Sequence, residues 1–204
     1  MKSRAAAPKA SAAASKKKAP GEVRLIGGRW KRSKLPVPDQ PGLRPTPDRV
    51  RETLFNWLGQ DLRDWRCLDA FAGTGALGFE AASRGATSVL MLERDPNLVD
   101  KLIQTRQRLA ADMVTVRRAD AVTAMGALPA ASFELILLDP PFDSNLAEPA
   151  LRLSAKLVSP GGFIYLEASS PCSEESLSQR GLRLFRHLKA GAVHAHLLRP
   201  AFAA

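Results

Sequence analysis

The stretch RCLDAFAGTGALG, residues 66–78, decides the fold of this 204-residue chain. A short apolar run ends near Asp69, Gly73 and Gly75 follow, and helix-forming residues begin at Ala76. A strand, a glycine turn and a helix in this order bring backbone N–H groups and the positive end of a helix close to a polar or anionic ligand. The stretch therefore predicts a nucleotide-like ligand at the end of the first core strand.

Strand and helix patterns alternate after this stretch. Helical spacing is expected over 76–84, 96–111 and 146–157. The short apolar runs between and beyond these stretches are RCLDAF, TSVLMLE, MVTVRR, ELILLD, GFIYLEA, LRLFRHLKAG and AVHAHLLRP. Alternating strands and helices predict a parallel sheet with helices on both faces, and the last two runs predict an antiparallel hairpin at one edge. We therefore expect an α/β fold with a mixed sheet of about seven strands.

Acidic residues end the next two expected strands. Glu93 follows Gly73 at the distance where the dinucleotide fingerprint G-x-G-x-x-G places an acid for ribose hydroxyls. GTGALG satisfies that fingerprint, so the glycines alone do not separate NAD from S-adenosylmethionine. Two other acids favour S-adenosylmethionine: Asp69 is placed to meet a charged amino group, and Asp120 can accept from the adenine amino group of a bound nucleoside.

The motif DPPF, Asp139–Phe142, follows the strand ELILL and carries the expected chemistry. Pro140 and Pro141 lack N–H donors, which leaves the Asp139 carboxylate and the Pro140 carbonyl as acceptors, while Phe142 adds an aromatic face. Such a site suits a flat ring that bears an NH₂ group. Because the two acceptors hold the amine in place, its lone pair can turn toward an electrophilic methyl donor. We therefore expect methyl transfer to a nucleobase amine.

Positive charge is concentrated in the first quarter of the chain. Residues 1–51 carry 14 Lys and Arg against three acids, whereas residues 52–204 carry 16 against 17, which together give the net charge of +10. A near-neutral body with a basic front predicts one face that contacts a polyanion, most often nucleic acid. The candidate RNA-contacting residues are Arg29, Lys31, Arg32, Lys34, Arg44, Arg49 and Arg51.

The chain divides into three expected parts. Residues 1–21 are rich in Ala and Lys and hold no aromatic, β-branched or acidic residue, which predicts a disordered basic arm. Residues 22–62 predict a β-hairpin around Gly27 and Gly28, followed by a helix that Thr46 can cap. Residues 63–204 form the expected catalytic domain.

Composition excludes several classes of protein. No apolar run approaches the roughly 18 residues of a membrane-spanning helix. Cys67 and Cys172 are too few for a disulfide framework and fit a reducing compartment, so we expect a cytoplasmic protein. His194 and His196 share a face of an expected strand, but a third ligand is missing from the pattern and His187 fits none, so we expect no metal site.

The chain resembles the RsmD family of bacterial small-subunit ribosomal RNA methyltransferases over roughly residues 23–199. The resemblance rests on FAGTGALG, Glu93, Asp120 and DPPF, and more specifically on VRLIGGRWKRSKLPVP and GLRPTPDRVRETLFNWL. It implies a class I, Rossmann-like methyltransferase fold and transfer of a methyl group from S-adenosylmethionine to N2 of a guanine in 16S rRNA. It further implies a monomer that acts within a small-subunit assembly particle.

The resemblance also implies roles for individual residues. Asp139, Pro140, Pro141 and Phe142 would hold the target guanine. The cofactor would be held by Phe71, Gly73, Gly75, Glu93, Asp120 and Ala121, and we expect Asp69 and Arg94 to belong to the same site. One position departs from the family pattern, because Arg32 stands where the hairpin usually carries a glycine.

Three other functions remain open from the residues alone. An N6-adenine DNA methyltransferase would use the same acceptors, although such enzymes commonly carry Tyr or Trp at the place of Phe142 and a larger target-recognition region. A NAD(P)-dependent dehydrogenase would use the same glycine loop but would leave DPPF without a purpose. A non-catalytic RNA-binding module is disfavoured because Asp139 and the glycines are intact.

Overall fold

The structure, a computed structural model, describes residues 21–38, 46–142 and 144–201. Residues 1–20 of the expected basic arm lie outside these ranges, and so does Arg44. Across the described ranges, no helix is both long enough and apolar enough to cross a membrane.

Seven strands form one mixed sheet, as the sequence predicts. Across the sheet they lie in the order β5 (Val114–Arg118), β4 (Ser88–Glu93), β3 (Arg66–Asp69), β6 (Phe133–Leu138), β7 (Val158–Ala168), β9 (Val193–Pro200) and β8 (Leu182–Ala190). The first five are parallel, and β9 runs antiparallel to both β7 and β8. The strand order reverses at β3, and ligands of open α/β sheets bind at such a switch point.

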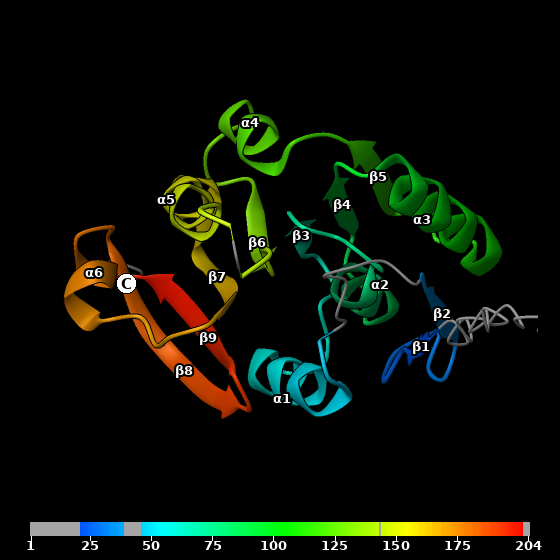
Figure 1. Ribbon diagram of the computed structural model, residues 1–204, viewed down its shortest axis with the longest axis horizontal. Helices are drawn as coiled ribbons and strands as arrows, with labels where there is room; N and C mark the ends of the chain where they lie inside the picture. Colours follow the sequence, from blue (N-terminus) through cyan, green and yellow to red (C-terminus); the bar gives the residue numbers. More distant parts are fainter. Residues whose placement is uncertain (1–20, 39–45, 143, 202–204) are drawn as a thin grey trace, which may run out of the picture.

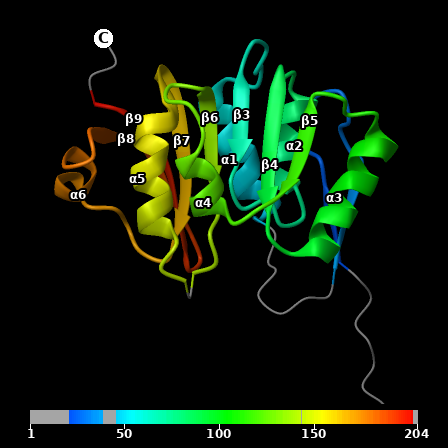
Figure 2. The same cartoon turned by 90° about the horizontal axis from the view of Figure 1, so that it is seen from above.

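Helices cover both faces of the sheet (Figures 1 and 2). On one face, α1 (Asp48–Leu58), α2 (Ala76–Ser83) and α3 (Pro96–Leu109) share a buried core with the N-terminal hairpin. On the other face, α4 (Ala121–Gly126), α5 (Ala147–Leu157) and α6 (Glu174–Ser178) enclose a second core. The sequence did not predict α4 and α6, whose side-chain caps are Asp120 and Ser173.

The N-terminal hairpin is shorter than its sequence pattern suggests. Its strands are β1 (Gly21–Arg24) and β2 (Lys34–Val37), which pair in an antiparallel manner. In the loop between them, Arg32 has a φ of 72°, in the left-handed region that favours glycine. A non-glycine residue there costs roughly 1–2 kcal/mol, so a glycine would fit this position at a lower cost.

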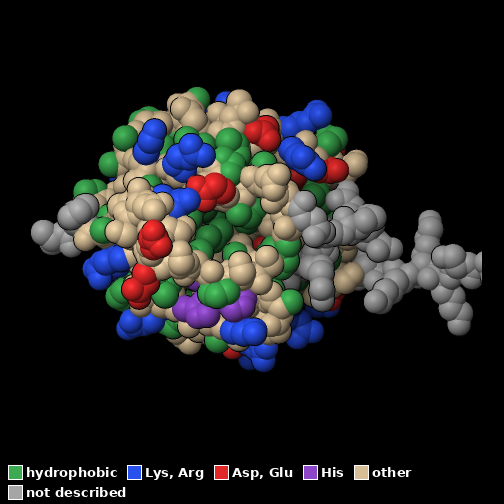
Figure 3. Space-filling model, turned by 60° about the vertical axis from the view of Figure 1, so that its left-hand side comes forward, with side chains coloured by type: hydrophobic (Ala, Val, Ile, Leu, Met, Phe, Trp, Pro, Cys, Tyr) green, Lys and Arg blue, Asp and Glu red, His purple; other side chains and the backbone are tan. Residues whose placement is uncertain are grey.

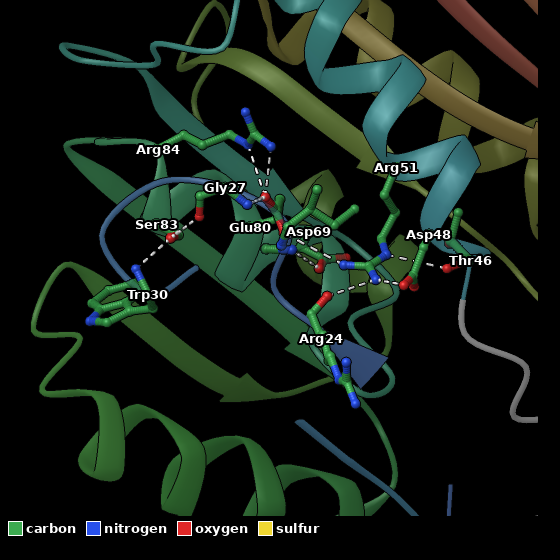
Figure 4. A network of polar contacts seen from close by, with 12 residues as sticks. Arg24, Gly27, Trp30, Thr46, Asp48, Arg51, Asp69, Glu80, Ser83 and Arg84 are labelled. Atoms are coloured by element: carbon green, nitrogen blue, oxygen red, sulfur yellow. Dashed lines mark hydrogen bonds and ion pairs between the residues drawn. The ribbon is translucent and has the colours of Figure 1, made fainter. Parts of the chain in front are cut away.

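Glu80 of α2 anchors the hairpin and α1 to the sheet domain (Figure 4). Its buried carboxylate accepts the backbone N–H groups of Ile26 and Gly27, both at 2.8 Å. It also accepts from Nε of Arg84 at 2.9 Å and faces Nη1 of Arg51 at 3.5 Å. A buried carboxylate is stable only when it is paired and hydrogen-bonded. Arg84 belongs to the end of α2 itself, so the other three partners fix how the hairpin and α1 sit on α2.

The expected RNA contact by Arg51 is wrong. Its side chain is 0% exposed, and its Nη2 atom donates to the Arg24 carbonyl at 2.9 Å and to Asp48 at 2.7 Å. Arg51 lies three and four residues before Leu54 and Phe55, so it shares the inner face of α1 with them. Its charge therefore stabilises the fold by pairing with Glu80 and is not available to a ligand at the surface.

Candidate active site

Carboxylates gather at the carboxyl edge of the parallel strands. Asp69 ends β3, Glu93 ends β4, Asp120 follows β5 and Asp139 follows β6. Glu167 lies near the end of β7 and joins this series, although the sequence analysis did not single it out. Because parallel strands end at one edge, the predicted cofactor and substrate residues lie along the same side of the molecule.

The glycine loop after β3 has the geometry that the sequence predicts. Gly73 and Gly75 both have positive φ, 52° and 77°. A Cβ at Gly75 would lie 2.6 Å from side-chain atoms of Leu102 and Phe79, so the loop packs tightly against α2 and α3. The Glu93 carboxylate holds the loop by accepting the Gly73 N–H at 2.9 Å. Phe71, at the start of the loop, is half-buried.

Asp69 is buried beneath this loop and is only 1% exposed. Its Oδ2 atom accepts the N–H of Gly78, in α2, at 2.9 Å. Burial raises the pKa of Asp69 to about 7, and the nearby negative charge of Glu93 adds to the shift. Asp69 thus fastens the end of β3 to α2, and direct contact with a cofactor amino group remains a prediction.

Asp120 is exposed and is the N-cap of α4. Its carboxylate accepts the Thr123 N–H at 2.9 Å, and hydrogen bonds from Thr123 lower the pKa of Asp120 below its usual value. Arg94 is exposed and adds a smaller lowering of the Asp120 pKa, while Ala121 is buried directly after the cap. An ionised acceptor at the end of β5 is what a hydrogen-bond donor on a bound base requires.

The DPPF motif leaves β6 at the same edge. Asp139 is partly exposed, Pro140 is buried, and Phe142 is 45% exposed although it is a large apolar side chain. Exposed aromatic faces of this kind are platforms on which nucleobases stack. The arrangement keeps an acceptor and an aromatic face next to each other at the strand end.

Thr46 joins Asp139 to a second acid that the sequence analysis missed. Its hydroxyl lies 2.7 Å from Glu167 and 3.3 Å from Asp139, and the Tyr165 hydroxyl donates to the same Glu167 oxygen at 2.8 Å. The expected capping role of Thr46 is wrong, because Pro47 is the N-cap of α1 and makes no side-chain cap. The N-terminal extension, residues 22–62, therefore contacts the DPPF motif directly through Thr46.

Glu167 is buried and Asp139 is half-buried. Burial raises the pKa of Asp139 well above its ordinary value, and the charges of Glu167 and Asp69 raise it further. Burial also raises the pKa of Glu167, against the lowering effect of its hydrogen bonds from Thr46 and Tyr165. Because Thr46 has one hydroxyl hydrogen, it can donate to only one acid at a time. Both contacts are hydrogen bonds at the same time only when one of the two acids is protonated and donates to the Thr46 oxygen.

The basic residues of the extension lie mostly on the surface. Arg29, Lys31 and Arg32, in the loop between β1 and β2, are exposed. Lys34 is exposed and pairs with Glu22 at 2.8 Å, and Arg49 is exposed on α1. These five residues are available to a polyanion, and contact with RNA remains a prediction for each.

Known proteins resemble this chain over most of its length. Residues 23–199 match a protein family described as Conserved hypothetical protein 95. A relative from Escherichia coli (strain K12), named Ribosomal RNA small subunit methyltransferase D, is 46% identical over 133 residues, 65% of this chain and 67% of the relative. The protein of the same name from Haemophilus influenzae is 44% identical over 156 residues, 73% of this chain and 80% of the relative.

Solved structures show the same fold. A putative methyltransferase from Escherichia coli has a TM-score of 0.77 at 36% identity and covers 89% of this chain and 99% of its own. The T. thermophilus 16S rRNA N2 G1207 methyltransferase, solved with AdoMet and guanosine, has a TM-score of 0.69 at 22% identity, covering 89% and 50%, and shows the fold alone. With the class I methyltransferase fold and the match over residues 23–199, this chain belongs to the family described as Conserved hypothetical protein 95, the RsmD family.

Proposed function

We propose that this chain transfers a methyl group from S-adenosylmethionine to the exocyclic N2 of a guanine in 16S rRNA. Family membership supports the general activity, because the relatives are named ribosomal RNA small subunit methyltransferases. One observation carries the choice of base: Asp139 and Glu167 meet at Thr46 beside the two prolines of DPPF.

Two neighbouring acids favour guanine over adenine. The Watson–Crick edge of guanine presents N1–H and N2–H₂ as adjacent donors, whereas adenine presents its amine beside an acceptor nitrogen. Asp139 and the Pro140 carbonyl can hold the amine, and Glu167 keeps a second acceptor close by for N1–H. An acceptor nitrogen placed against these carboxylates would repel them or leave them unpaired. The base reaches this site unstacked, because a duplex hides its amine.

The residues around the glycine loop fit S-adenosylmethionine, which supplies an electrophilic methyl group. The loop packs against α2 and α3, and its two glycines adopt positive φ angles that other residues rarely take. Glu93 lies where a ribose is expected, and the ionised Asp120 can accept from an adenine amino group. The residues that we assign to the cofactor are Asp69, Phe71, Gly73, Gly75, Glu93, Arg94, Asp120 and Ala121.

Asp139 has two tasks in this mechanism. Ionised, it accepts a hydrogen bond from the amine and orients the nitrogen lone pair. When the new N–C bond forms and the methyl–sulfur bond of the donor breaks, the nitrogen must lose a proton, and a carboxylate with a raised pKa can hold it. The Thr46 hydroxyl lies within hydrogen-bond distance of both Asp139 and Glu167, so it can pass that proton from Asp139 to Glu167.

A methyl-transfer assay tests the proposal. Labelled S-adenosylmethionine is offered with unmodified small ribosomal subunits, naked 16S rRNA and duplex DNA in parallel, and mass spectrometry identifies the modified nucleoside. We expect N2-methylguanosine from subunits or rRNA. Label in N6-methyladenine from DNA would instead establish the adenine methyltransferase.

The variant Asp139→Ala tests the role of the acceptor in the same assay. We expect methyl transfer to fall at least about 100-fold, in the range that a positioned acid–base group contributes. Cofactor affinity, measured by calorimetry, should stay within about threefold because Asp139 lies outside the glycine loop. Asp100→Ala, at an exposed position of α3, is the matched control. Near-full transfer by Asp139→Ala would exclude the acceptor mechanism.

A further inference from the structure

The chain has three histidines, and all of them meet on the C-terminal hairpin. His187 lies on β8 and is opposite His196 of β9, and His194 lies two residues before His196 on the same face. In Figure 3 the imidazoles form one purple patch on the surface. The proposed methyl transfer uses none of them.

The ring nitrogens have a spacing that suits a shared ion. Nε2 of His187 lies 3.0 Å from Nδ1 of His194, and one ring nitrogen from each of the three residues lies within 4.8 Å of the others. Two nitrogens bound to one tetrahedral zinc ion at roughly 2.0–2.1 Å lie about 3.3 Å apart. The outer pair, which shares a hydrogen bond between its two rings in the structure, is already near that spacing.

His196 is buried behind the outer pair in a fixed tautomer. The backbone N–H of Cys172 donates to its Nε2 atom at 3.1 Å, so that nitrogen is unprotonated. Its Nδ1 atom therefore carries the hydrogen and lies 3.3 Å from the Leu166 carbonyl oxygen. Metal-binding histidines usually have their second ring nitrogen hydrogen-bonded in this way. A bound ion would take the Nε2 lone pair in place of the Cys172 N–H.

The chemical type of the cluster suits a transition metal. A cluster of imidazole nitrogens favours Zn²⁺, Cu²⁺, Ni²⁺ or Co²⁺ over Mg²⁺ and Ca²⁺, which prefer oxygen ligands.

We propose that His187, His194 and His196 bind one divalent transition metal ion, with Zn²⁺ as the best match. The site lies on the opposite face of the sheet from Glu167. Leu166 and Ala168 pair with His196 and His194, and Glu167 between them points to the other face with Tyr165. The ion ties β8 to β9, and its fourth position is open to water. This differs from the expectation from sequence, where His187 fitted no pattern.

Metal titration tests the site directly. The full chain, without an affinity tag and stripped with a chelator, is titrated with Zn²⁺ by calorimetry and with Co²⁺ by visible absorption. We expect one ion per chain and a tetrahedral Co²⁺ spectrum. His187→Gln and His194→Gln should each weaken Zn²⁺ binding at least tenfold. Cys172→Ser, which removes the nearest thiol and keeps the backbone N–H, should bind as the wild type does.

Variants of His187 and His194 separate a loss of metal binding from a loss of folding, because neither side chain is fully buried. His196→Gln alters a buried side chain, whereas the double variant His187→Gln/His194→Gln changes two rings that are not fully buried. Zn²⁺ should raise the unfolding temperature of the wild type and leave that of the double variant unchanged. The proposal is overturned if the wild type shows no saturable binding, or if the double variant binds Zn²⁺ with wild-type affinity.

Discussion

At the scale of single residues, the paired acids at the DPPF motif decide the pH dependence of the proposed reaction. Asp139 must be ionised to accept from an amine, so methyl transfer should rise with pH through its raised pKa. The charge of Glu167 contributes to that rise in pKa, and Glu167→Gln removes the charge while keeping groups that hydrogen-bond to Thr46 and Tyr165. We therefore expect the midpoint of the pH–rate profile to move to lower pH in Glu167→Gln.

Single-turnover rates across the pH range measure this change in the midpoint. Glu175→Gln, an exposed change on α6, is the control and should keep the wild-type midpoint. If Glu167→Gln also keeps it, the two acids are not coupled in the working enzyme.

Asp69 should make the stability of the fold depend on pH. Its pKa is raised from 3.8 to about 7, so the folded state binds a proton more tightly than the unfolded state. The stabilising proton is present below the unfolded pKa, and stability falls as pH rises toward the folded pKa. A tenfold difference in proton affinity between the two states corresponds to about 1.4 kcal/mol. Asp69→Asn cannot ionise and should flatten this dependence.

Urea unfolding from about pH 4 to about pH 8 gives both curves. The free energy of unfolding of the wild type should fall relative to that of Asp69→Asn as the pH rises. Parallel curves would show that Asp69 does not carry the raised pKa.

At the scale of elements, the contact between the N-terminal hairpin and α2 depends on one glycine. Gly28 has a φ of 70°, and a Cβ there would lie 1.8 Å from the Ser83 carbonyl oxygen. Gly181 has a similar φ of 65° but open space around it. Gly181→Ala should therefore cost only the conformational term of about 1–2 kcal/mol, whereas Gly28→Ala should cost clearly more and loosen the hairpin. Denaturant unfolding of both variants compares them, and equal losses would contradict a tight contact at Gly28.

Elements with a clear period were predictable from sequence, and short ones were not. The seven strands and α1, α2, α3 and α5 follow from apolar spacing and glycine breaks. The helices α4 and α6 span six and five residues, too few for a helical period, and only their capping residues Asp120 and Ser173 mark them. Thr46 was misassigned because a hydroxyl before Pro47 also looks like a cap.

At the scale of the whole molecule, the sequence motifs predicted where the candidate active site lies but not all of the residues that form it. DPPF and the glycine loop act locally, so their place in the sequence gives their place in the fold. Glu167 lies 28 positions beyond Asp139 and meets it only through sheet topology and Thr46. Charge counting has the same limit, because it cannot tell that Arg51 faces the core whereas its neighbour Arg49 is exposed.

The segregation of charge leads to a prediction for RNA binding. If the hairpin loop contacts phosphates, each contact contributes roughly 0.7–0.9 to the slope of log affinity against log salt concentration. The triple variant Arg29→Gln/Lys31→Gln/Arg32→Gln should therefore bind 16S rRNA more weakly and with a slope smaller by up to about three. Its cofactor affinity should be unchanged, because the glycine loop is intact.

The double variant Arg152→Gln/Lys156→Gln controls for the loss of positive charge in general. Both residues are exposed on α5, on the face of the sheet opposite the hairpin. Filter binding at several salt concentrations should give this control the wild-type slope. If the slope falls by the same amount per removed charge in both variants, RNA affinity depends only on the net charge of the protein. A reduction confined to the hairpin variant would locate the phosphate contacts in the hairpin loop. RNA bound there would lie on the same N-terminal segment as Thr46, which contacts Asp139.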